Sequence, residues 1–307
     1  MNVLITGSSG QIGTNLGLAL QARGDYVQGI DRRTNSWTDR IPTLQLDLVR
    51  AGPEDFPSDR KFDVVVHLAA NAKVFALVEN PQGAMDNITV AFNVLEYCRR
   101  TRTPIVFASS REVYGDIHRH ITEEAAADFV VAESPYSASK IAGEALVYSY
   151  AQCYDLPFLV FRYSNVYGRF DNDLDRMERV IPLFVHRIGR DQPIVVFGKE
   201  KVLDFTYVDD CVAGTRAGID ALVQARVVGQ TINLACGRGG TLVDVVNIIA
   251  LALGKKPNVR YEPSRPGEVT RYVADITKAK SLLGYEPQVP LSEGLPRGIE
   301  WAQGFKR

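Results

Sequence analysis

A tyrosine and a lysine stand four residues apart in the segment YSASK, at Tyr136 and Lys140. The surrounding sequence is compatible with a helix, on which residues four apart lie on the same face. A free tyrosine is a poor base at neutral pH because its pKa is roughly 10, and a neighbouring ammonium group favours the phenolate. The pair therefore predicts a base that removes a proton from a hydroxyl group of a bound substrate.

A serine that can join this pair is Ser110, which ends the apolar run PIVFASS. The run predicts a buried strand, and ligands of open α/β sheets bind at the carboxyl ends of such strands. As a set, Ser110, Tyr136 and Lys140 resemble the catalytic trio of the short-chain dehydrogenases/reductases, and their expected positions agree with that role. The same stretch, FASSREVYGD, adds the carboxylate of Glu112 as a further catalytic candidate.

A glycine-rich loop precedes the first predicted helix. The segment ITGSSGQIG places Gly7, Gly10 and Gly13 at the junction between a strand and this helix. Glycines there permit a sharp turn, the close approach of a phosphate and tight packing of helix on strand. The free N–H groups of the helix start then face a pyrophosphate. We expect these glycines, with Gln11 and Ile12, to bind a dinucleotide cofactor.

An acidic residue, Asp31, ends the second predicted strand, YVQGID. A carboxylate at this place accepts hydrogen bonds from both ribose hydroxyls of NAD and repels the 2′-phosphate of NADP. Arg32 and Arg33 follow, and an arginine can hold a 2′-phosphate, although both are also expected to face solvent. The sequence favours NAD over NADP.

The elements that position these residues alternate along the first half of the chain. Helical patterns separate the apolar runs NVLIT, YVQGID, TLQLDL, FDVVVHLAA, PIVFASS and PFLVFRYSNV. The runs lack strict alternation of apolar and polar residues, which is typical of strands buried on both faces of a parallel sheet. This order predicts an α/β protein with a Rossmann-type, doubly wound parallel sheet.

The pattern changes after Gly168, where we expect a smaller C-terminal substrate-binding lobe that shares segments with the first. A helix is predicted over 181–189, and another over TLVDVVNIIALAL with Thr241 and Asp244 as its capping box. The predicted division assigns residues 1–166 and about 204–232 to the NAD-binding domain, and residues 167–203 and about 233–307 to the substrate-binding lobe.

Charge and composition exclude several classes of protein. The 307 residues carry a formal net charge of −1, so no nucleic-acid or acidic membrane partner is expected. The four cysteines match neither a zinc site nor a disulfide framework, and we interpret them as free thiols in a reducing compartment. His118 and His120 lack a third ligand nearby, so no metal is predicted.

No targeting or membrane-spanning segment is predicted either. The first strand begins at Asn2, which leaves no room for a secretory signal. The most apolar stretch, VVNIIALALG, is too short to span a bilayer. We therefore expect a cytoplasmic protein.

Together, the motifs resemble the extended short-chain dehydrogenases/reductases, and among them the NAD-dependent epimerase/dehydratase family. The resemblance covers nearly the whole chain, through the glycine spacing, the trio, RYSNVYG, DFTYVDD and RPGEVTRYVADITKAKSLLGYEP. It implies NAD as cofactor, bound in part by Tyr136 and Lys140, and a nucleotide sugar as substrate. It also implies contacts to adenine by Asp47 and Leu48, to the cofactor by Ala69, Ala70 and Asn87, and to the sugar nucleotide by Asn165 and Arg265.

One departure from the family concerns the substrate diphosphate. Leu203 stands where the family often has an arginine that grips this group. Diphosphate binding is then expected to depend on Arg265, whose planar guanidinium can bind bidentately. Arg271, Lys199 and Lys201 are further candidates.

The second departure is Arg111-Glu112, directly after the catalytic serine. Related 4-epimerases usually carry small or hydroxyl residues there, 4,6-dehydratases two acids, and decarboxylases serine and glutamate. Glu112 thus matches enzymes in which a glutamate acts at C5 once C4 has been oxidised to a ketone. Arg111 can attract the C6 carboxylate of a uronic acid, or pair with Glu112 and neutralise it. The alternative is that Arg111 faces solvent and Glu112 joins a hydrogen-bond network.

The whole-chain resemblance favours an NAD-dependent nucleotide-sugar 4-epimerase that acts on a UDP-hexose or UDP-hexuronic acid through a transient 4-keto sugar. A dehydratase or decarboxylase that uses Glu112 at C5 is the alternative. A non-catalytic dinucleotide-binding sensor is a third hypothesis, which the presence of both Tyr136 and Lys140 disfavours. Relatives pair through two helices of the NAD-binding domain, so a homodimer is expected.

Overall fold

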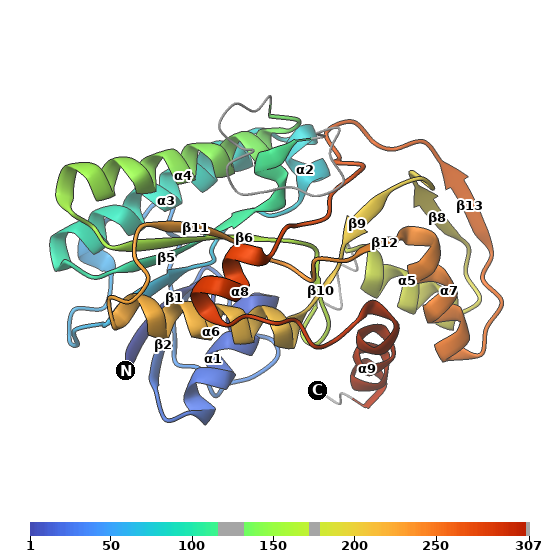
Figure 1. The fold of residues 1–307 in the computed structure, drawn as a ribbon, viewed down its shortest axis with the longest axis horizontal. Coiled ribbons are helices and arrows are strands. Elements are labelled where there is room, and N and C mark those ends of the chain that lie inside the picture. Colours follow the sequence, from blue (N-terminus) through green and yellow to red (C-terminus); the bar gives the residue numbers. More distant parts are fainter. Residues whose placement is uncertain (116–131, 172–178, 305–307) are drawn as a thin grey trace.

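A parallel sheet of seven strands organises the first part of the chain (Figure 1). The computed structural model describes residues 1–115, 132–171 and 179–304. The strands lie in the order β11-β6-β5-β4-β1-β2-β3 and are all parallel. Their bounds are β1 Asn2–Thr6, β2 Tyr26–Asp31, β3 Thr43–Gln45, β4 Val64–His67, β5 Ile105–Ser110, β6 Phe158–Tyr163 and β11 Gln230–Leu234.

Helices cover both faces of this sheet, as Figure 1 shows. On one face lie α1 (Gln11–Ala22), α6 (Val208–Val223) and α8 (Thr277–Leu283). The other face packs against α3 (Gln82–Thr101) and α4 (Pro135–Tyr154). Layers of this kind bury a parallel sheet completely, and they confirm the predicted Rossmann-type α/β fold.

Strand β1 shows why the apolar runs lack alternation. Val3 and Ile5 belong to the core under α1 and α6, whereas Leu4 belongs to the core under α3 and α4. All three side chains are fully buried. Since successive side chains of a strand point to opposite faces, a strand between two helical layers needs apolar residues at every position.

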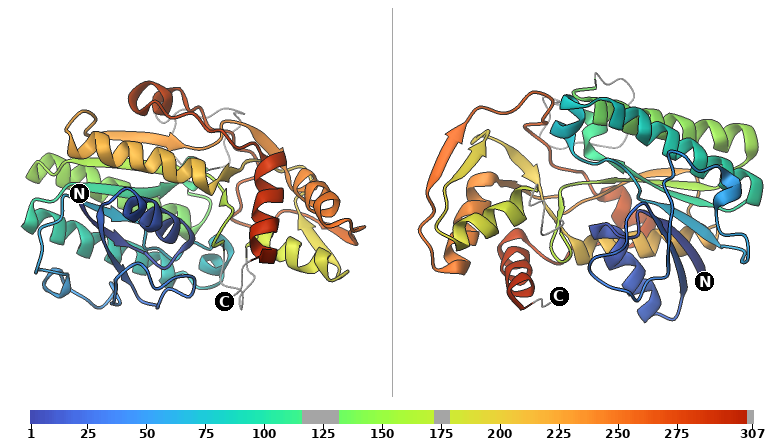
Figure 2. Two further views of the ribbon diagram at one scale, coloured as in Figure 1. Left: turned by 90° about the horizontal axis from the view of Figure 1, so that it is seen from below. Right: turned by 180° about the vertical axis from the view of Figure 1, so that it is seen from behind.

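A second group of elements lies beside the carboxyl ends of the sheet strands, with its own hydrophobic core (Figures 1 and 2). Its main elements are α5 Val180–Gly189, β8 Ile194–Phe197, α7 Leu242–Leu253, β13 Val259–Glu262 and α9 Leu291–Gly304. The predicted capping box of α7 is present, since Thr241 and Asp244 exchange side-chain and backbone hydrogen bonds. No helix of the described ranges is both long and apolar enough to cross a membrane.

Short elements connect the two groups. Strand β7 pairs in parallel with β10, and β9 pairs antiparallel with β12. The remaining bounds are η1 Pro53–Asp55, α2 Val74–Glu79, η2 Arg111–Tyr114, β7 Val166–Tyr167, β9 Val202–Asp204, β10 Thr206–Tyr207 and β12 Gly239–Thr241.

The division of the chain into two lobes remains a proposal, and the separate cores support it. The chain passes between them more than once, because β11 returns to the sheet after α5 and β8. Ala279 in α8 and Tyr285 just beyond it also pack in the core under α1 and α6. The C-terminal region thus contributes a segment to the first lobe.

Three aromatic rings join segments from both groups. The rings of Trp37, in the loop after β2, and Trp301, in α9, have centroids 5.7 Å apart. Phe170 lies 5.7 Å from Trp37 and 4.9 Å from Trp301. The cluster ties the loop beyond Asp31 to the last helix.

Candidate active site

The glycine loop between β1 and α1 has no room for a side chain at Gly7 or Gly13. Gly7 has φ +76°, and a Cβ there would lie 2.7 Å from the backbone nitrogen of Ala69 at the end of β4. A Cβ at Gly13 would lie 2.2 Å from the carbonyl oxygen of Gly7. Gly10 caps α1 without a side-chain oxygen that could occupy the N–H groups of the first turn. This cradle fits a dinucleotide pyrophosphate at a helix start.

Asp31 ends β2 beside this loop and is buried. Its two oxygens accept hydrogen bonds from the backbone nitrogens of Ser9 and Arg33, each at 3.0 Å. Arg32 and Arg33 are exposed, and Arg32 donates to the side chain of Asn71 at 3.1 Å. The carboxylate is therefore fixed in place, whereas the neighbouring arginines extend over the surface.

The other predicted cofactor residues follow the ends of β3 and β4. Asp47 accepts the backbone N–H of Val49 at 3.1 Å, and the carbonyl of the buried Leu48 accepts the Asn93 amide at 2.9 Å. Asn87, in α3, accepts the backbone N–H of Asn71 at 2.7 Å, directly beyond the Ala69-Ala70 pair. Asn87 also donates to Ser139 of α4 at 3.1 Å. This amide ties the β4 end to α4, the helix that carries Tyr136 and Lys140.

The structure brings the predicted trio together at the carboxyl end of β5. Tyr136 and Lys140 lie on one side of α4, and both are buried. The Lys140 ammonium donates to the carbonyl of Ala108 at 2.8 Å and lies 5.9 Å from the centre of the Tyr136 ring. Ser110 accepts the backbone N–H of Glu112 at 3.2 Å.

Burial shifts the protonation of this group. It raises the pKa of Tyr136 to about 12, while a hydrogen bond with Ser110 acts in the opposite direction. Burial also lowers the pKa of Lys140 to about 8, against the attraction of Glu144. His67, at the end of β4, has its pKa lowered to about 3 by burial and then by Lys140. Its ring shares a 2.7 Å hydrogen bond with Thr6. The imidazole is therefore neutral near pH 7.

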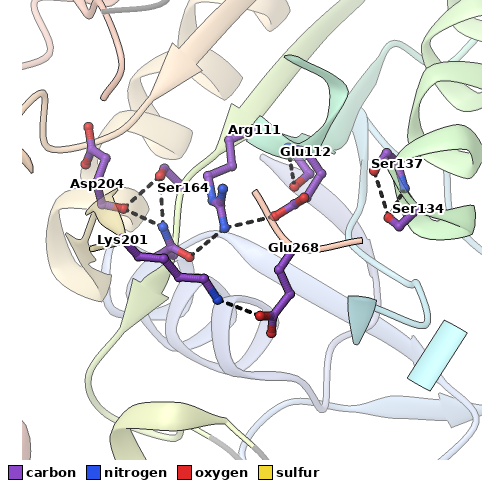
Figure 3. A network of polar contacts seen from close by, with 10 residues as sticks. Arg111, Glu112, Ser134, Ser137, Ser164, Lys201, Asp204 and Glu268 are labelled. Atoms are coloured by element: carbon purple, nitrogen blue, oxygen red, sulfur yellow. Dashed lines mark hydrogen bonds and ion pairs between the residues drawn. The ribbon is translucent and has the colours of Figure 1, made fainter. Parts of the chain in front are cut away.

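Arg111 and Glu112 form a buried ion pair within η2 (Figure 3). Arg111 Nη2 lies 2.8 Å from Glu112 Oε1 and donates to Asn165 Oδ1 at 3.3 Å. Burial raises the pKa of Glu112, and the charge of Arg111 acts in the opposite direction. Of the three sequence hypotheses for Arg111, exposure to solvent is wrong, pairing with Glu112 is observed, and attraction of a C6 carboxylate stays a prediction.

The amide of Asn165 is held by a second set of contacts. Asn165 has φ +33° and donates to the backbone carbonyl of Asp204 at 2.8 Å. The Asp204 carboxylate accepts three backbone N–H groups, from Cys236 at 2.9 Å, Gly237 at 2.8 Å and Ala274 at 3.2 Å. Burial raises the pKa of Asp204 to about 6, and these N–H groups act in the opposite direction. Asp204 belongs to the motif DFTYVDD, but no role was predicted for its carboxylate.

Arg265 lies between two aromatic rings. Its guanidinium is 3.8 Å from the centre of Phe197 in β8 and 4.8 Å from the centre of Phe75 in α2. The segment that carries Arg265 thus contacts both β8, in the second group of elements, and α2, in the first lobe. At Gly267, with φ +80°, a Cβ would lie 3.1 Å from the side chain of Val78, also in α2.

The candidates for the missing diphosphate arginine differ in their surroundings. Leu203 is buried in the second core, and Lys201 is buried and paired with Glu268 at 2.5 Å. Arg271 is exposed, and Lys199 lies 5.5 Å from the ring of Tyr261, an exposed residue of β13. The Lys201–Glu268 pair escaped the sequence analysis because 67 residues separate its members.

His118 and His120, at which no metal was predicted, lie outside the described residues.

A family model described as the NAD dependent epimerase/dehydratase family matches residues 3–235. The chain belongs to this family. The resemblance drawn from the glycine loop, the trio and the C-terminal motifs is thereby confirmed. The chain is 31% identical to a UDP-glucuronate 4-epimerase of Thermodesulfobacterium geofontis, over 98% of this chain and 95% of that protein.

Solved structures of two family members superpose on this fold. The UDP-glucose 4-epimerase of Thermotoga maritima with UDP-glucose gives a TM-score of 0.90 at 28% identity and covers 99% of both chains. The UDP-glucuronic acid 4-epimerase of Bacillus cereus, in complex with UDP-glucuronic acid and NAD, gives 0.89 at 28% identity and the same coverage. The two neighbours act on sugars that differ in charge.

Proposed function

We propose that the protein is an NAD-dependent nucleotide-sugar 4-epimerase that acts on a UDP-hexose or UDP-hexuronic acid through a transient 4-keto sugar. The observation that carries this proposal is the meeting of Ser110, Tyr136 and Lys140 at the carboxyl end of β5, on the same edge of the sheet as the glycine loop. The named activities of the relative and of the two structural neighbours support it.

The trio provides the acid–base chemistry of this reaction. NAD, when bound, would supply the hydride acceptor and donor for C4 of the sugar. Tyr136, as the phenolate, takes the proton of the C4 hydroxyl as the ketone forms, and gives it back when the alcohol of opposite configuration forms. Among the described contacts, Lys140 uses one of its three N–H donors, on the Ala108 carbonyl, and the other two can hold a ribose. Burial raises the pKa of Tyr136 to about 12, against the Ser110 hydrogen bond and the charges of Arg111 and Arg179, and a ligand cation beside the ring would lower it.

The cofactor preference rests on the geometry at the β2 end. The Asp31 carboxylate is fixed by two backbone N–H groups, so it presents its remaining lone pairs to ribose hydroxyls. A 2′-phosphate at the same place would meet a buried negative charge. We infer NAD, and the exposed Arg32 and Arg33 do not change this inference because neither is held over the ribose side of Asp31 by a described contact.

Chemistry at C5 is the second hypothesis, because Glu112 follows Ser110 and has a raised pKa. A C5 base must reach carbon with a free carboxylate oxygen. Glu112 Oε1 is engaged by Arg111, which supports a binding role for the pair. The other oxygen, Glu112 Oε2, is not engaged by Arg111, so it is the atom that would act as a base at C5 under this hypothesis.

One experiment separates these reactions. The protein is incubated with NAD in heavy water and with UDP-glucose, UDP-N-acetylglucosamine, UDP-glucuronic acid or dTDP-glucose, and proton NMR follows C4 and C5. Inversion at C4 with retention of the C5 proton is the expected result. Exchange at C5, or loss of water or carbon dioxide, would instead support a dehydratase or decarboxylase in which Glu112 acts at C5. NAD binding without any conversion would favour the sensor.

We further propose a homodimer formed through α3 and α4. Large apolar or aromatic side chains are exposed on both helices, namely Met85 and Phe92 on α3 and Tyr148 and Tyr154 on α4. Burial of such a surface stabilises association. Sedimentation equilibrium of the wild type and of Phe92→Glu tests this proposal, with a monomeric variant as the expected result.

A further inference from the structure

Two polar atoms beside the trio are buried without a partner. Arg111 is 8% exposed and Glu112 is 4% exposed. Their ion pair uses Nη2 and Oε1, which leaves Arg111 Nη1 and Glu112 Oε2 without a hydrogen bond among the described residues. Since buried polar groups are normally satisfied, an unpaired donor and an unpaired acceptor on adjacent residues indicate a ligand with hydrogen-bonding groups.

The pair lies next to the atoms that react. It directly follows Ser110, and the charges of both Arg111 and Glu112 are close enough to shift the pKa of Tyr136, in opposite directions. Arg111 also donates to Asn165 at the end of β6, so it bridges the carboxyl ends of two neighbouring strands. A sugar whose C4 hydroxyl meets Tyr136 would place an adjacent substituent at this pair.

The charges in the surroundings leave the pair close to neutral. Glu112 compensates Arg111 at 2.8 Å, and Lys201 and Glu268 compensate one another at 2.5 Å. The Asp204 carboxylate is occupied by backbone N–H groups. Among the described residues near the pair, Lys140 is a cation without a carboxylate ion pair, and its ammonium is held at the Ala108 carbonyl beside Tyr136.

The chemistry of the two unpaired atoms selects the ligand group. A hydroxyl both donates and accepts, so the C6 hydroxyl of a hexose can satisfy Glu112 Oε2 and Arg111 Nη1 together. A carboxylate only accepts, so it would satisfy Nη1 and face Oε2 across a short distance. Two carboxylates in a buried site repel one another strongly.

We propose that the Arg111–Glu112 pair recognises the C6 hydroxyl of a neutral hexose, in which C6 is carried by the carbon next to the reacting one, and discriminates against a hexuronic acid, in which C6 is a carboxylate. The inference rests on the proposed function of the same site and narrows its substrate class. It assigns specificity to two residues at which related 4-epimerases usually carry small or hydroxyl side chains.

Calorimetric titration of the NAD-loaded protein with UDP-glucose and with UDP-glucuronic acid tests the inference without requiring turnover. We expect a Kd for UDP-glucuronic acid that is at least about tenfold higher than that for UDP-glucose. Equal affinity, preference for the uronic acid, or binding of neither sugar would overturn the inference. C4 inversion with equal affinities would leave the proposed function standing, whereas selective binding without inversion would overturn the function alone.

Variants then locate the selectivity. In Glu112→Gln the repelling charge is gone and Arg111 keeps its own, so the ratio of the two Kd values should fall by about tenfold. The double variant Arg111→Met/Glu112→Gln removes both charges and guards against misfolding of the single variant; its ratio should also fall. An unchanged ratio in both would overturn the assignment. Glu96→Gln, in the 2.8 Å Arg99–Glu96 pair of α3, is the matched control and should keep the wild-type ratio.

Discussion

Arg111 Nη2 lies 2.8 Å from Glu112 Oε1, so two consecutive residues form an ion pair that is almost completely removed from solvent. In a strand, consecutive side chains point to opposite faces. Here the chain leaves β5 and enters the short helix η2, which turns both side chains toward the same place. Each charge depends on its sequence neighbour for compensation.

Substitution of one member of the pair should therefore lower the free energy of unfolding more than substitution of both. Arg111→Met leaves the Glu112 carboxylate buried without a counter-ion and should lower the free energy of unfolding by about 3 kcal/mol or more. Arg111→Met/Glu112→Gln removes both charges and should lose less. Urea denaturation of the three proteins measures the difference. A double variant less stable than the single one would contradict this account.

Tyr136→Phe removes the proposed acid–base group and keeps the ring. The turnover number for C4 inversion should fall by about a hundredfold or more, while the Kd for the nucleotide sugar changes little. Tyr154→Phe is the matched control, since Tyr154 is exposed on the same helix. Comparable losses in both variants would argue against the role of Tyr136.

Lys140 should give the stability a characteristic dependence on pH. Burial lowers its pKa from 10.5 to about 8. Below pH 8 the folded protein carries the full cost of a buried charge. Between pH 8 and 10.5 the folded lysine is neutral while the unfolded one is protonated, so stability rises with pH by about 3 kcal/mol. The free energy of unfolding of the wild type minus that of Lys140→Met should increase accordingly between pH 7 and pH 10.

Urea denaturation at both pH values provides this comparison. Lys256→Met, at an exposed position, sets the baseline for removal of a lysine. If the free energy of unfolding of the wild type minus that of Lys140→Met falls with rising pH, burial does not determine the pKa of Lys140.

Asp204→Asn should destabilise the protein although it changes one atom. Three backbone N–H groups converge on the carboxylate, and an amide would place an NH₂ group against at least one of them. An unsatisfied buried donor, with loss of the charged acceptor, costs about 3 kcal/mol. Thermal and urea unfolding measure this loss. The exposed Asp209→Asn should stay within about 0.5 kcal/mol of the wild type.

Asp31→Asn should relax the choice of cofactor. The amide keeps one acceptor oxygen and removes the charge that opposes a 2′-phosphate, so the ratio of the Kd values for NADP and NAD should fall by about tenfold. Fluorescence titration with both cofactors measures the ratio. The exposed Asp39→Asn serves as control. An unchanged ratio would assign the preference to another residue.

The sequence was sufficient for elements whose signals are local. The apolar runs predicted β1 and β2 with their observed bounds, and the capping box located α7. The run TLQLDL was predicted as a longer strand than the observed β3, Thr43–Gln45, because an edge strand has only one neighbour to pair with. Strands of two or three residues such as β7 and β10 carry no local pattern and form through long-range pairing.

The residues of the site likewise fall into those with a local sequence signal and those whose position depends on distant parts of the chain. The glycine loop and the Tyr136–Lys140 spacing are local motifs, and the structure brings them to the same edge of the sheet. The contacts of Asp204 were not predictable, because its hydrogen-bond partners lie 32 to 70 residues further along the chain. The direction of the Arg111 side chain was left open, since it depends on how η2 turns.

The aromatic cluster of Trp37, Phe170 and Trp301 gives the protein an intrinsic optical reporter. The chain contains two tryptophans, and their rings lie 5.7 Å apart in this cluster. All of its tryptophan emission therefore arises where the loop beyond Asp31 meets α9. A change in emission wavelength on addition of a cofactor or a nucleotide sugar would report a rearrangement at this junction without any attached label.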